Sequence, residues 1–141
     1  MMIKENQTTM KNNKDIISYI KEICKFMHES GMDVKPYPKL RISKDKSYID
    51  DVMGPTAWYQ PENKTITLIT EGRHPKDILR SFFHEMIHHC QNNRGDMKKE
   101  NVKSLNDKNY TQNNKHLRKL EGEAYLKGNM LMRDWTDTRK K

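Results

Sequence analysis

Apolar residues recur every three or four positions in three stretches of the chain, and this spacing predicts three amphipathic helices. The first is expected over residues 14–30, with Asn13 as its N-cap and Gly31 as its C-terminal stop. The second is expected over residues 75–92, where a proline occupies the first position, and the third over residues 114–134. Each of these helices therefore has one face that must be buried.

Two short runs of β-branched and aromatic residues predict a β-hairpin. Residues 56–60 (TAWYQ) and 65–70 (TITLIT) are joined by the link PENK, which is rich in turn-forming residues. Residues 34–43 contain two prolines, which exclude a helix and favour an extended segment at a sheet edge. The predicted fold is therefore α+β, with an N-terminal helix, a short and mostly antiparallel sheet, and two further helices.

One domain is expected, because 141 residues can bury a single modest core. It spans residues 14–135, between a disordered N-terminus at residues 1–13 and a polar tail at residues 136–141. Residues 93–115 contain almost nothing apolar, so we expect a mobile loop between the second and third helices.

The sequence carries no sign of a membrane or secreted protein. No window approaches 18 apolar residues, and the N-terminus has no apolar core of the kind that secretory signals carry. Cys24 and Cys90 both fall on apolar helix faces, where a thiol packs as a small hydrophobic group, so no disulfide is expected. We therefore expect a soluble, cytoplasmic protein.

The net charge of +8 favours nucleic acid or an acidic partner. However, the lysines are scattered, and no arginine-rich or aromatic-interleaved run is present. A solvated, lysine-rich surface is the simpler explanation, and nucleic acid stays a secondary hypothesis.

The second predicted helix contains the sequence His84-Glu85-Met86-Ile87-His88. Four helical residues turn through about 400° and rise about 6 Å, so both imidazoles project from one side and can share one ion. Zinc binds imidazole nitrogen at about 2.0 Å, and an adjacent carboxylate can take the proton from a zinc-bound water. The motif predicts two metal ligands, His84 and His88, and a general base, Glu85.

A third ligand is expected from the last helix, which carries Glu121 and Glu123. Glu121 falls on the core-facing stripe formed by Leu117, Ala124 and Gly128, whereas Glu123 is rotated about 200° away from it. The small residues on this stripe would let two helices approach closely. We therefore expect Glu121 to complete a His2Glu site, with Glu123 as the alternative.

The motif at residues 84–88, followed by Glu121-x-x-Ala124, resembles the gluzincin zinc metallopeptidases. The size of the chain and its short sheet resemble the smallest of these, the minigluzincins. Residues 73–81, which lead into the motif, and the residues after the glutamate also resemble small bacteriophage metallopeptidases. The resemblance covers roughly residues 40–135.

The resemblance implies a short sheet over two helices, with His84, His88 and Glu121 binding zinc and Glu85 acting as the base. It also implies cleavage of protein or peptide substrates, in the host cytoplasm if the protein is encoded by a phage. Larger gluzincins often have Asp or Asn four residues after the ligand glutamate to orient a histidine. This chain has Tyr125 there.

The strand predicted at residues 56–60 would lie over the cleft as an edge strand. Ala57, Trp58 and Tyr59 would then bind an extended substrate through main-chain hydrogen bonds. An ordinary strand with Trp58 packed inward fits the pattern equally well. His74 and His89 are expected to be a turn residue and a flanking residue.

Some alternatives stay open from sequence. The chain could be a zinc-stabilised binding or regulatory domain without turnover, or a latent protease acting on nucleoprotein. In the latent form, residues 93–115 or the tail after Trp135 would fill the cleft. The sequence does not choose an oxyanion donor among four candidates, which are Tyr110, His116, Arg118 and Tyr125.

Overall fold

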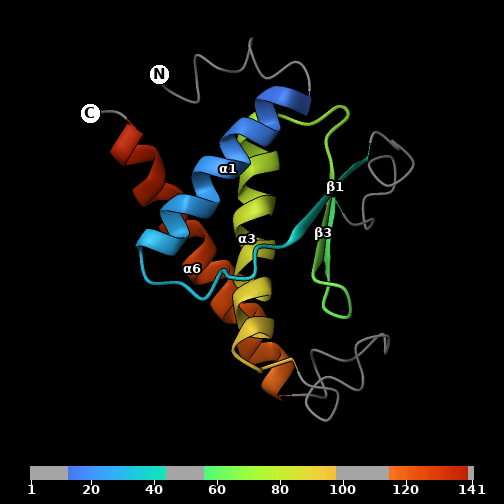
Figure 1. Ribbon diagram of the computed structural model, residues 1–141, viewed down its shortest axis with the longest axis vertical. Helices are drawn as coiled ribbons and strands as arrows, with labels where there is room; N and C mark the ends of the chain where they lie inside the picture. Colours follow the sequence, from blue (N-terminus) through green and yellow to red (C-terminus); the bar gives the residue numbers. More distant parts are fainter. Residues whose placement is uncertain (1–12, 44–55, 98–114, 140–141) are drawn as a thin grey trace.

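The computed structural model describes residues 13–43, 56–97 and 115–139. Within these residues the fold is α+β, as predicted, and α3 lies between the sheet on one side and α1 and α6 on the other (Figure 1). The helices are α1 (Asn13–Glu29), α3 (Pro75–Asn93) and α6 (Lys115–Arg139), and the strands are β1 (Lys39–Ser43), β2 (Ala57–Gln60) and β3 (Thr65–Ile69).

Helix α3 is the centre of the fold because its apolar residues cover more than one face. Ile78, Phe82 and Met86 are among its fully or almost fully buried side chains. The helix starts at Pro75, whose fixed φ suits the first turn, and His74 caps it by accepting a hydrogen bond from the Lys76 amide at 3.1 Å. His74, expected to be a turn residue, is thus the N-cap of α3.

The strand order is β1-β3-β2, which makes β2 an edge strand. The predicted hairpin is confirmed, because β2 and β3 pair antiparallel. Strand β1 pairs with β3 in parallel, so the sheet is mixed rather than mostly antiparallel. The sequence could not give this direction, because side chains alternate in the same way along parallel and antiparallel strands.

Helix α6 is longer than the sequence predicted. Residues 136–139, expected in a polar tail, form its last turn. The guanidinium of Arg139 lies 4.9 Å from the centre of the Tyr19 ring and 5.0 Å from that of Trp135, and it also pairs with Glu22 on α1. These contacts hold a polar helix end against the domain. The expected disorder of residues 1–12 and most of the expected loop, residues 98–114, fall outside the described residues.

The core is formed by the buried faces of the three helices and one face of the sheet. Cys90 is buried in it, Cys24 packs against it, and both are free thiols. None of the helices within the described residues is long and apolar enough to cross a membrane.

Candidate metal centre

Helices α3 and α6 approach closely where α6 carries small residues. Ala124 is fully buried, and a Cβ atom placed on Gly128 would lie only 3.3 Å from the His84 Cα. Backbone atoms move aside less easily than a flexible side chain, so this tight contact favours glycine over any larger residue. The close approach that the sequence predicted is therefore present, and it places Glu121, two turns before Gly128, opposite the histidines.

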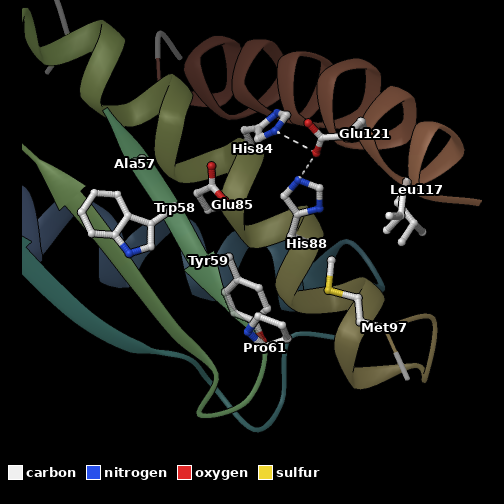
Figure 2. A pocket seen from close by; sticks show the side chains of 11 residues that line it. Ala57, Trp58, Tyr59, Pro61, His84, Glu85, His88, Met97, Leu117 and Glu121 are labelled. Carbon is white, nitrogen blue, oxygen red and sulfur yellow. Dashed lines mark ion pairs between the residues drawn. The ribbon is translucent and has the colours of Figure 1, made fainter. Parts of the chain in front are cut away.

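Three ligand atoms from the two helices converge at this point (Figure 2). One suitable atom each from His84, His88 and Glu121 lies within 4.8 Å of the others. Glu121 Oε1 is 2.5 Å from His88 Nε2 and 3.8 Å from His84 Nε2. Ligand atoms of a tetrahedral zinc ion are about 3.3 Å apart, so side-chain adjustments of about 1 Å would fit these residues to one ion.

The ligand carboxylate is held in its ionised form. Hydrogen bonds with His84 and His88 lower the pKa of Glu121 to about 2. Burial alone would lower the pKa of His88, but the hydrogen bond with Glu121 and the charge of Glu85 outweigh burial and raise it. Two nitrogen donors and one anionic oxygen donor form a set that suits zinc.

Glu85 lies beside these residues but is not one of the three converging groups. Its carboxyl group projects between β2 and the two imidazoles in Figure 2. The residue is buried, and burial raises its pKa more than the nearby His88 and His84 lower it. Burial therefore favours the protonated form of Glu85 more than in an exposed carboxyl group.

Gln91 orients His88 from the side opposite the ligand atoms. The Oε1 atom of this fully buried residue lies 2.8 Å from His88 Nδ1. The Nε2 atom donates hydrogen bonds to the Leu120 carbonyl at 2.9 Å and to Glu123 Oε1 at 2.8 Å. Because two acceptors face the amide nitrogen, its oxygen must face His88. His88 Nδ1 therefore carries a proton, and Nε2 is the nitrogen available to a metal.

Glu123 anchors this arrangement and does not join the ligands. It accepts hydrogen bonds from Arg94 Nη2 at 2.6 Å and from Gln91, and it pairs with Lys127 Nζ at 3.2 Å. Burial raises the pKa of Glu123, but these hydrogen bonds outweigh burial and lower it to about 2. Glu121, and not Glu123, therefore groups with the two histidines in this structure. Gln91 was not among the predicted site residues, although its position three residues after His88 on the same helix could have revealed it.

His89 is a buried structural residue rather than a flanking one. Its Nε2 lies 2.6 Å from the Pro36 carbonyl oxygen and 3.1 Å from that of Val34, so this nitrogen donates. Its Nδ1 then accepts from the Tyr59 hydroxyl at 2.9 Å, and that hydroxyl accepts from Asn92 Nδ2 at 2.9 Å. Burial raises the pKa of Tyr59 to about 12, so the phenol stays protonated. These bonds fix the edge strand β2 on α3.

Two cavities flank the cluster and meet at Ala57, His84, Glu85 and Glu121. The first has a volume of about 240 Å³ and an apolar far end, and Figure 2 shows its lining. The second, of about 530 Å³, extends toward the first half of α3. The residues expected to bind substrate line the first cavity, and they are Ala57, Trp58 and Tyr59. Ala57 and Tyr59 pack on the core, whereas Trp58 does not belong to it.

Of the three candidate oxyanion donors that the structure describes, Tyr125 is the one whose ring packs on the cluster. Its ring centre is 4.4 Å from that of His84, and 62% of the residue is exposed. It therefore packs on a ligand ring at the position where larger gluzincins often have a carboxylate or amide. The imidazole Nε2 of His116 bonds to the Asp96 carbonyl at 2.8 Å, and Arg118 is exposed. Tyr110 lies outside the described residues.

Compared with known proteins, the chain matches no family model, no curated protein and no solved structure. The functional proposal therefore depends on the geometry and chemistry of the site.

Proposed function

We propose that this protein is a zinc-dependent metallopeptidase that hydrolyses peptide bonds. The observation that supports this most strongly is the convergence of His84, His88 and Glu121 from two helices, with the separate carboxylate of Glu85 beside them. The same residues are those expected from the resemblance to gluzincins and minigluzincins. His84, His88 and Glu121 would hold the zinc ion.

Zinc in such a site lowers the pKa of water and polarises a carbonyl group. Glu85 accepts a proton from the attacking water and passes it to the leaving amine, for which its raised pKa is suited. Gln91 keeps the His88 imidazole in the tautomer that presents Nε2.

The free edge of β2 supports binding of an extended peptide. The Thr56 carbonyl accepts from the Ile69 amide at 3.0 Å, which sets the alternation of hydrogen bonds between β2 and β3. In this alternation the backbone groups of Ala57 and Tyr59 point away from β3, toward the open edge. A substrate strand can pair with these backbone groups directly beside the proposed zinc site.

The proposal is tested with zinc-loaded wild-type protein and the Glu85→Gln variant on a peptide library. We expect cleavage by the wild type and a rate about 10²–10⁴-fold lower for the variant, because general base catalysis contributes about this much. Zinc content should be equal, because Glu85 is not a ligand. The matched control is Glu29→Gln, a change at an exposed residue of α1 that should leave both properties unchanged.

Zinc-loaded wild type that cleaves no peptide would contradict the proposal and favour a zinc-stabilised binding domain. Within the latent alternative, the tail is disfavoured, since residues 136–139 line neither cavity beside the cluster. Residues 98–114 lie outside the described part of the chain.

A further inference from the structure

A third cavity, of about 500 Å³, lies between the first half of α3 and the second half of α6. It shares Arg80 and Asn129 with the 530 Å³ cavity, which His84 and Glu121 also line. The two hollows therefore adjoin, and together they extend from the cluster of His84, His88 and Glu121 along the seam between the helices.

Three cationic side chains line this third cavity, namely Lys76, Arg80 and Arg133. Asp137 also lines it, and Asp77 forms an ion pair with Arg80 at 2.8 Å. Within the described part of the chain, no ion pair within 4.0 Å is found for Lys76 or Arg133. These two side chains come from different helices, and with Arg80 they give the hollow three cationic lining residues against one carboxylate, that of Asp137. The surplus of positive charge can therefore attract an anion that enters it.

The opposite end of the groove differs in character. Among the residues that line the 240 Å³ cavity, none is Lys or Arg, and its far end is formed by Pro61, Met97, Leu117 and Leu120. The three adjoining cavities beside His84, His88 and Glu121 thus form a groove that is apolar at one end and cationic at the other. A bound peptide would meet the two ends in a fixed order.

The spacing of the cations along α3 gives the position of the anion. Arg80 precedes His84 by one turn, about 6 Å, and Lys76 precedes it by about 12 Å. An extended peptide advances about 3.3 Å per residue, so these distances correspond to about two to four residues. Antiparallel pairing with β2 is the more stable arrangement, and it directs the C-terminal part of the peptide toward Thr56 and this cavity.

We propose that the cavity lined by Lys76, Arg80 and Arg133 binds a carboxylate of the substrate, about two to four residues on the C-terminal side of the cleaved bond. This inference rests on the proposed peptidase function. The carboxylate can come from an Asp or Glu side chain or from the C-terminus of a short peptide, since both present the same chemistry.

The test compares peptide pairs that differ only by Glu or Gln at these positions, all with amidated C-termini. Zinc-loaded wild type should cleave the Glu peptides with a kcat/KM about threefold or more above that of the Gln peptides, as expected for solvent-exposed ion pairs. The Lys76→Gln/Arg133→Gln variant should lower this ratio to near one. Lys25→Gln, which removes an exposed charge on α1, should leave the ratio at its wild-type value.

A ratio near one in the wild type, or a ratio unchanged in the double variant, would overturn the Asp or Glu version. The terminal carboxylate is then tested by comparing Gln peptides that have free C-termini with the same peptides in amidated form. Equal kcat/KM values for the free and amidated peptides would overturn the proposal altogether.

Failure of peptidase activity is distinguishable from failure of this site. If zinc-loaded wild type cleaves nothing, fluorescence anisotropy of labelled Glu and Gln peptides on the zinc-loaded Glu85→Gln variant still measures the binding preference. Equal affinities, with free or amidated C-termini, would refute the carboxylate site by itself.

Discussion

Replacing Gln91 with Leu should separate the orientation of His88 from the fold of the domain. The substitution has similar volume but removes the acceptor for His88 Nδ1 and the donor to the Leu120 carbonyl and Glu123. Glu123 keeps its bonds with Arg94 and Lys127, so its charge stays compensated. The substitution therefore removes hydrogen bonds mainly from His88 Nδ1 and from the Leu120 carbonyl.

The size of the effect follows from these lost contacts. Groups that orient a metal ligand typically contribute about 10–100-fold to metal affinity, which is about 1.4–2.7 kcal/mol. The unsatisfied His88 N–H should cost about 1–3 kcal/mol of folding stability, whereas the Leu120 carbonyl keeps its backbone hydrogen bond within α6. We therefore expect Gln91→Leu to fold with a lower melting temperature and to bind zinc about 10–100-fold more weakly.

Zinc affinity is measured by competition with a chromophoric chelator, and folding by far-ultraviolet circular dichroism. The Glu123→Gln variant is the matched control, because its side-chain oxygen can still accept from Gln91 Nε2 and its zinc affinity should change little. Wild-type zinc affinity in a folded Gln91→Leu protein would refute the assignment of Gln91 as the residue that orients His88.

Three further changes have defined outcomes. Gly128→Ala should destabilise the protein by about 1–3 kcal/mol in urea denaturation, because the new Cβ lies 3.3 Å from His84 Cα, whereas Gly122→Ala meets nothing within 4 Å and should stabilise it by about 0.5–1 kcal/mol. Tyr59→Phe removes the bonds that fix β2 and should raise KM with little change in zinc affinity, measured by peptide kinetics and chelator competition. The rise in melting temperature on zinc addition should shrink as the pH falls, and the loss should begin above the ordinary histidine pKa of about 6.5, because the pKa of His88 is raised and zinc must displace its proton.

The two helices of the site could be predicted because their constraints are local. The four-residue spacing of His84 and His88 fixes their common side on any helix, and the small residues Ala124 and Gly128 mark where another helix can approach. The choice of Glu121 follows from the same geometry. These features need no knowledge of distant contacts.

The features that the sequence did not reveal depend on contacts between distant segments. The parallel pairing of β1 with β3 joins two segments that are distant in the sequence, and side-chain alternation does not show its direction. Burial of His89 depends on the Val34 and Pro36 carbonyls, more than 50 residues earlier in the chain. The last turn of α6 depends on the ion pair and ring contacts of Arg139 with α1. Local polarity alone predicts the opposite outcome for both His89 and Arg139.

The two carboxylates of the site differ in their electrostatic surroundings. Glu121 meets the imidazoles directly, and their hydrogen bonds lower its pKa to about 2. Glu85 is buried beside them, and burial raises its pKa. In the proposed peptidase the metal ligand must stay ionised, whereas the base must take up and release a proton, so opposite shifts suit the two tasks. The difference arises because Glu121 comes from α6, where it faces both imidazoles, and Glu85 comes from α3, where it lies buried beside them.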